Sequence, residues 1–104
     1  MDAGAPLIIV LGSVVVREGE VARALALSQQ HVARSRAEPG CLAHAVHLDS
    51  ENPLRLVFVE QWSDRAALDV HFEVPASRAF VKALSAMACA PPGIAIYEAA
   101  PLRT

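Results

Sequence analysis

The run Glu60-Gln61-Trp62-Ser63-Asp64-Arg65-Ala66-Ala67-Leu68-Asp69-Val70-His71 passes from an apolar strand into a helix. Either Ser63 or Asp64 can cap this helix, because short polar side chains accept hydrogen bonds from the free N–H groups of the first turn. By the i, i+3, i+4 rule, the inward stripe of the helix consists of Ala67, Leu68, His71 and Phe72. The run therefore predicts a sheet with a helix packed on one face.

Residues on both sides of this run predict a ferredoxin-like fold. The expected strands cover residues 7–16, 41–48, 54–62 and 94–99, and the middle two form a hairpin. The expected helices cover residues 20–37, 63–74 and 76–88. Val74-Pro75 separates the last two helices, because the residue before a Pro disfavours the α conformation. The order is β-α-β-β-α-β, an α+β fold in which helices cover one face of a four-stranded antiparallel sheet.

The first strand indicates that the other face of the sheet is also covered. Its sequence, Leu7-Ile8-Ile9-Val10-Leu11-Gly12-Ser13-Val14-Val15-Val16, is apolar on both faces. The 104 residues form one domain, with its core over about residues 7–99, and 54% of them are hydrophobic. A domain of this size has little interior relative to its surface. We therefore expect a homodimer in which the open sheet faces pack together.

Composition and charge exclude several classes of partner. A net charge of −2 and one lysine provide no electrostatic footprint for nucleic acid. The apolar run over residues 7–16 lacks the basic segment and cleavage site of a signal peptide, and it is too short to cross a bilayer as a helix. Cys41 and Cys89 have no CxxC spacing, and we interpret them as reduced, partly buried thiols of a cytoplasmic protein. We expect no nucleic-acid or membrane partner.

Side-chain alternation places candidate functional residues on the strands. Phe58, Glu60 and Trp62 share one face of their strand. On the preceding strand, Leu42 and His44 share a face with Val46 and Leu48, and the other face carries Cys41, Ala43, Ala45 and His47. Purely structural roles are open for each candidate: Trp62 as a core anchor, Glu60 in water or paired with an Arg, His71 as a core histidine with one hydrogen bond. His31 lies off the apolar stripe of its helix, and we expect it on the surface.

The quoted run, together with Glu38-Pro39-Gly40-Cys41-Leu42 at a strand start, resembles the antibiotic biosynthesis monooxygenase (ABM) family from about Leu7 to Tyr97. The resemblance implies a ferredoxin-like domain that pairs into a dimeric α/β barrel. It also implies that four positions point at the helices: Leu42, His44, Glu60 and Trp62. His44, Glu60, Trp62 and His71 would then converge. An aromatic residue is common in the family where this chain has His44. A buried carboxylate near imidazole is a frequent setting for acid–base function.

The sequence contains no recognisable metal or cofactor motif. His44 and His47 are three residues apart on a strand and so project to opposite faces, and no His, Cys, Asp or Glu cluster has zinc-like spacing. A Gly-rich phosphate loop for flavin or nicotinamide is missing. Heme-degrading relatives use an Asn and a heme-ligating His at positions that fall near Gly12 and near Phe80 or Val81 here, and these residues cannot serve. We expect no metal and no cofactor.

These observations favour a cofactor-independent monooxygenase that oxidises an electron-rich phenol, quinol or anthrone-like small molecule with O₂. Such a substrate supplies the electrons once it is deprotonated, so the protein must provide a dry pocket, a base and hydrogen-bond donors. The expected catalytic residues are His71 as base or oxyanion donor, Glu60 fixing the tautomer of His71, and His44 as a second donor. The expected substrate-binding residues are Trp62, Phe58, Phe72 and Phe80.

Two alternatives use the same pocket. One is a non-catalytic dimer that binds a small metabolite, such as a stress-response protein. The other is an isomerase. Both would need the same apolar cavity and the same polar residues, so the sequence does not separate them from an oxygenase.

Overall fold

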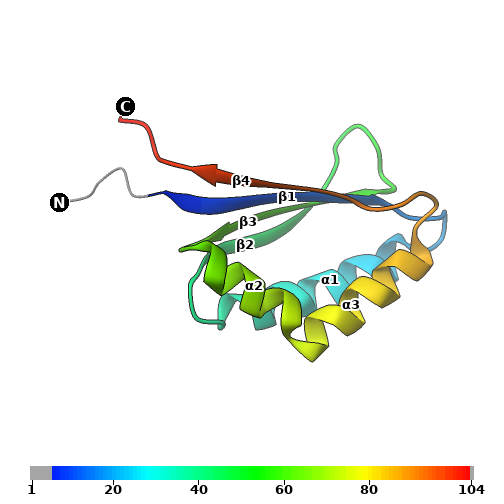
Figure 1. Ribbon diagram of the computed structural model, residues 1–104. Helices are drawn as coiled ribbons and strands as arrows, with labels where there is room; N and C mark the ends of the chain where they lie inside the picture. Colours follow the sequence, from blue (N-terminus) through cyan, green and yellow to red (C-terminus); the bar gives the residue numbers. More distant parts are fainter. Residues whose placement is uncertain (1–5, 104) are drawn as a thin grey trace.

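The computed structural model describes residues 6–103 and has the element order β-α-β-β-α-α-β (Figure 1). The strands are β1 (Leu7–Val15), β2 (Cys41–Leu48), β3 (Arg55–Trp62) and β4 (Gly93–Ala99). The helices are α1 (Val21–Arg36), α2 (Arg65–Glu73) and α3 (Pro75–Met87). The predicted ferredoxin-like fold is confirmed, and the elements differ from the predicted ranges only at their ends. Between residues 6 and 103, no helix has the length and apolar character needed to cross a membrane.

The four strands form one antiparallel sheet in the order β2-β3-β1-β4. The register places Glu60 in the middle of the sheet, opposite His44 on β2 and opposite Val10 on β1. All three helices lie on one side of this sheet (Figure 1). Glu60 and His44 therefore face the layer of helices rather than the opposite side.

The helix-facing side of the sheet holds two apolar clusters. One cluster includes Phe58, Phe80 and Leu84. The other contains Ile8, Val10, Trp62 and Leu68. Along β3, Phe58 belongs to the first cluster and Trp62 to the second, so Glu60 lies between them. The middle of β3 therefore places a buried carboxylate between the two apolar clusters.

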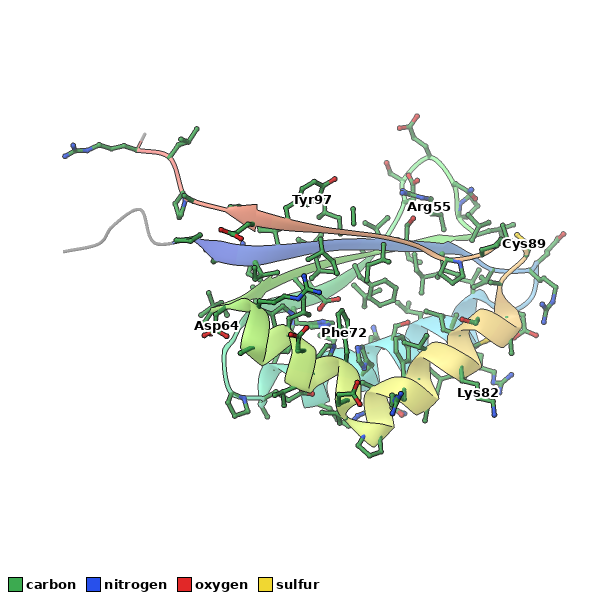
Figure 2. All side chains as sticks on the ribbon, in the orientation of Figure 1. Arg55, Asp64, Phe72, Lys82, Cys89 and Tyr97 are labelled. Atoms are coloured by element: carbon green, nitrogen blue, oxygen red, sulfur yellow. The ribbon has the colours of Figure 1, made fainter. Side chains whose placement is uncertain are left out.

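The opposite side of the sheet is apolar and is not covered by any element between residues 6 and 103 (Figure 1). A row of apolar side chains crosses it in register: Ala45, Val59, Leu11 and Ala95. Leu11 is 43% exposed and Tyr97 is 52% exposed. Figure 2 shows Tyr97 pointing away from the helices. The alternation in β1 is as expected, with Val10 and Val14 buried under the helices and Leu11 on the open side.

A β-bulge at the start of β2 changes the predicted facing of its first residues. Cys41 lies opposite Trp62, and the register then shifts between Cys41 and Ala43. As a result Cys41 packs against the Trp62 cluster, whereas Leu42, expected to face the helices, is 56% exposed. A bulge inserts one extra residue into a strand and therefore inverts the alternation on one side of it. The second thiol also differs from expectation: Cys89 is exposed rather than partly buried.

Candidate functional site: a buried cluster of histidines and carboxylates

Polar side chains from four different elements meet between the two apolar clusters. Their sources are α1 for His31, β2 for His44, β3 for Glu60 and α2 for His71. None of the four residues is more than 8% exposed. The ring centroids of the three imidazoles are 5.2 Å (His31–His44), 5.3 Å (His31–His71) and 5.7 Å (His44–His71) apart. We refer to His31, His44 and His71 as the histidine cluster.

The carboxylate of Glu60 is held by its neighbours on the sheet. The indole Nε1 of Trp62 donates a hydrogen bond of 2.9 Å to Glu60 Oε1. His44 Nε2 lies 3.3 Å from the same oxygen. Burial alone would raise the pKa of the Glu60 carboxyl, but the contact with His44 and the hydrogen bond from Trp62 outweigh it, so this pKa is lowered. Glu60 is therefore a buried carboxylate that keeps its charge.

His71 is paired with a carboxylate that the sequence pattern does not predict. Its Nδ1 lies 2.9 Å from Oε1 of Glu38, in the turn that follows α1. Glu60, the expected partner of His71, instead contacts His44 and Trp62. A carboxylate oxygen can only accept, so Nδ1 of His71 donates; in the neutral imidazole, Nε2 is then the nitrogen without a proton.

The turn before β2 explains how Glu38 reaches His71. Gly40 has φ +82°, a left-handed conformation that suits glycine, and a Cβ there would lie 2.5 Å from the Cβ of Ala67 on α2. The backbone N–H of Ser63 donates to the Gly40 carbonyl at 2.8 Å. Of the two residues expected to cap α2, Asp64 does so, accepting from Ala67 N at 2.8 Å. The turn and α2 are thus in direct contact.

His31 is buried, contrary to the surface position expected for it. Its side chain is 5% exposed and stacks on Phe80 with a centroid distance of 4.1 Å. The buried residues of α1 are Ala24, Ser28, His31, Val32 and Ser35. Position 31 follows Ala24 by seven residues, which is the helical spacing of one face, so the signal was present in the sequence. Burial, followed by the neighbouring His44 and His71, lowers the pKa of His31 to about 3, and its imidazole is therefore neutral.

A cavity of about 630 Å³ opens beside the cluster, between α3 and strands β1 and β4. Its lining includes one residue of the histidine cluster that was not predicted, His31, and five predicted site residues: Phe58, Glu60, His71, Phe72 and Phe80. Figure 2 shows Phe72 reaching from α2 into the space under the sheet. Trp62 and His44 were expected to take part in the pocket as a stacking wall and a donor. Neither residue lines the cavity. His44 lies opposite Glu60 on the neighbouring strand β2, and Trp62 is fully buried.

Two ring nitrogens in the cluster, Nδ1 of His31 and Nδ1 of His44, have no hydrogen-bond partner among residues 6–103, whereas Nε2 of His44 lies 3.3 Å from Glu60 Oε1. Buried polar atoms are almost always paired in folded proteins. Imidazole nitrogens with free lone pairs can accept protons or ligate metals. The cluster therefore has the chemistry of a proton-transfer or metal-ligating site, and it borders an apolar cavity.

Comparison with known proteins identifies the family of the chain. The sequence model of the family described as antibiotic biosynthesis monooxygenase matches residues 7–83, which cover all of the site residues described above. The chain belongs to the ABM family. A Synechocystis sp. protein described as uncharacterized is 35% identical over 97 residues, or 93% of this chain. The chain spans 66% of that protein's length, just under two thirds.

Solved structures also share the fold. A crystal structure of an antibiotic biosynthesis monooxygenase is 29% identical, with a TM-score of 0.84 over 90% of this chain and 99% of that one. A conserved protein from Methanosarcina mazei is 25% identical, with a TM-score of 0.86 over 91% of this chain and 94% of that one. A Deinococcus radiodurans protein is 24% identical and matches with a TM-score of 0.88 over 93% of this chain and 96% of that one. This ABM chain thus has the ferredoxin-like fold of its family over nearly its whole length.

Proposed function

We propose that this ABM protein is a cofactor-independent monooxygenase that uses O₂ to oxidise an electron-rich phenol, quinol or anthrone-like ring held in the cavity. One observation carries the proposal: His71 borders the apolar cavity while Glu38 holds its Nδ1 at 2.9 Å. This contact leaves Nε2 of His71 as a proton acceptor beside the space that a substrate would fill.

Proton abstraction is the step in which the protein takes part. Nε2 of His71 accepts the acidic proton of the substrate, and the Glu38 carboxylate stabilises the resulting imidazolium through the Nδ1–H hydrogen bond. For an anthrone-like ring, the resulting carbanion carbon bonds to O₂, and loss of water from the peroxide leaves a carbonyl. The net change is CH₂ + O₂ → C=O + H₂O. The substrate supplies all the electrons, so the reaction needs no further reductant.

The other site residues take supporting roles in this proposal. Phe58, Phe72 and Phe80 border the cavity and provide apolar walls for an aromatic ring. Glu60 also borders the cavity, and the hydrogen bond from Trp62 Nε1 holds its carboxylate in place. A carboxylate at this position disfavours an anion next to it, so the oxygen of the substrate is expected to lie toward His71.

We also propose that the protein acts as a homodimer through the open side of its sheet. The support is the apolar row formed by Ala45, Val59, Leu11 and Ala95, with Leu11 and Tyr97 among the exposed apolar residues. Monomeric proteins rarely expose an apolar patch of this kind. A second copy of the same face would cover it symmetrically.

A substrate screen tests the proposed reaction. Protein treated with a chelator is mixed with a panel of anthrones, quinols and phenols, and oxygen consumption is followed together with thermal stability. We expect at least one member of the panel to be oxidised with one O₂ consumed per product. A compound that raises the melting temperature without oxygen consumption would favour the binding-protein alternative. Conversion of a compound to an isomer without oxygen consumption would favour the isomerase.

A further inference from the structure

The histidine cluster brings together nitrogens from three separate elements of the chain. Taking one ring nitrogen from each of His31, His44 and His71, the three atoms all lie within 4.8 Å of one another. Each of these residues is at most 5% exposed. Three imidazoles in this arrangement match the protein ligands of a common type of zinc site, in which three histidines leave a fourth position open.

The distances between the rings also fit a shared ion. With a metal–nitrogen distance of about 2.1 Å and tetrahedral angles, the centroids of two imidazoles on one ion lie about 5.2 Å apart. The measured centroid separations are 5.2, 5.3 and 5.7 Å. The ligating nitrogens themselves must come to roughly 3.4 Å from one another. The nitrogens now lie within 4.8 Å of one another, so the side chains must rotate to bring them closer around an ion.

Unpartnered nitrogens provide an independent indication of a ligand. Within residues 6–103, His44 is 2% exposed and its Nδ1 has no hydrogen-bond partner, whereas its Nε2 lies 3.3 Å from Glu60 Oε1. Nδ1 of His31 is buried in the same way. A buried polar atom is almost always paired with protein, water or a ligand. A cation at the centre of the cluster would bind these lone pairs.

The carboxylates around the cluster suit a cation. Glu38 holds Nδ1 of His71, which is the carboxylate–histidine arrangement that usually orients metal ligands. Glu60 lies 3.3 Å from Nε2 of His44 and borders the cavity. The two negative charges offset the charge of a divalent ion, which three neutral imidazoles cannot do. The cavity reaches His31 and His71, so a fourth ligand position is accessible from it.

We propose that the histidine cluster binds one divalent first-row transition-metal ion per chain, through one nitrogen each of His31, His44 and His71. Closely spaced ligands are missing from the sequence, which therefore predicts no metal, whereas these histidines come from three separate elements, α1, β2 and α2. The inference goes beyond the proposed function and concerns binding alone. An ion there would take the Nε2 lone pair of His71, so metal binding and metal-free oxidation compete for one nitrogen.

Titration of chelator-treated protein with Co²⁺ and Zn²⁺ tests the site without any turnover. We expect one equivalent of Co²⁺ per chain, with the intense visible absorption of a four-coordinate ion and without the charge-transfer band of thiolate ligation. His31→Gln and His44→Gln should each weaken Zn²⁺ binding at least about 100-fold, and Glu38→Gln about 10–100-fold. The matched control is His47→Gln, because His47 is exposed on the same strand as His44 and should leave binding unchanged.

A second readout uses the unchanged chain, in case a variant does not fold. Long-range ¹H–¹⁵N spectra resolve the ring nitrogens of the four histidines. Zn²⁺ should shift one nitrogen in each of His31, His44 and His71 and leave His47 unaffected. Absence of binding at micromolar Zn²⁺ would overturn the proposal. So would Zn²⁺ binding that is unchanged in His31→Gln, or spectra in which Zn²⁺ shifts only the ring nitrogens of His47.

Discussion

Nδ1 of His71 and Oε1 of Glu38 lie 2.9 Å apart, although 33 residues separate them in the sequence. The contact fixes which nitrogen of His71 carries the proton and which one is free at the cavity. It also joins the turn after α1 to the middle of the site. The proposed reaction therefore depends on a residue outside the elements that line the cavity.

The Glu38→Gln substitution should lower kcat/KM for oxygen consumption by roughly 10–100-fold, because the glutamine can still accept from Nδ1–H but cannot stabilise the imidazolium by charge. Steady-state oxygen electrode measurements on the substrate found by the screen would show this. Glu18→Gln, at an exposed position, is the control and should retain full activity. Equal activity of the two variants would show that Glu38 does not stabilise the imidazolium of His71 during the reaction.

Gly40→Ala should destabilise the protein more than the same change at Gly19. Both glycines have a positive φ, +82° and +89°, which costs about 1–2 kcal/mol for alanine. Only at Gly40 would the new Cβ overlap another side chain, 2.5 Å from Ala67 Cβ, whereas nothing lies within 4 Å at Gly19. The overlap should add about 1–3 kcal/mol. Urea unfolding of both variants measures the difference, and equal losses would contradict the packing of the turn on α2.

Leu11→Glu should convert the dimer to a monomer, because it places two like charges in the middle of the proposed interface. A penalty of about 3 kcal/mol corresponds to a roughly 100-fold weaker dimer. Val70→Glu is the control, since Val70 is 63% exposed on a helix far from the open sheet face. Sedimentation at several concentrations distinguishes the two. A wild-type protein that is monomeric at every concentration would rule out the sheet-face dimer.

Zn²⁺ should inhibit oxygen consumption by the chelator-treated protein, because an ion on the histidine cluster occupies the nitrogen of His71 that accepts the proton. The expected inhibition follows the binding curve measured for Zn²⁺ in the absence of substrate. Addition of excess chelator should restore the activity. Full occupancy of the cluster by Zn²⁺ with unchanged turnover would show that His71 is not the base, and would leave the metal site intact.

The fold could be predicted because its signals are local. Alternation along β1 and β3, the stripe on α2 and the Val74-Pro75 break each depend on a few neighbouring residues. The pairing of Glu60 with Trp62 follows from the same alternation, since both side chains leave one face of β3. Convergence with His44 followed from the resemblance to the ABM family and agrees with the sheet register.

The misassigned parts of the site depend on contacts that sequence spacing does not define. His31 lies off the apolar stripe predicted for its helix and is therefore expected on the surface, although the structure places it on the buried face of α1. Glu38 reaches His71 only because the turn at Gly40 packs on α2, a tertiary contact with no local pattern. Leu42 and Cys41 exchanged faces because of a bulge that alternation alone cannot place.

The most direct test of the proposed chemistry compares His71→Ala with His47→Ala in chelator-treated protein, with oxygen consumption measured on one substrate and folding checked by sedimentation. His71 is buried at the cavity, and His47 is exposed on β2. Loss of a positioned base should lower the rate by about 10²–10⁴-fold in His71→Ala, while His47→Ala retains the wild-type rate. A folded His71→Ala protein with wild-type oxygen consumption would contradict the role of His71 as the base.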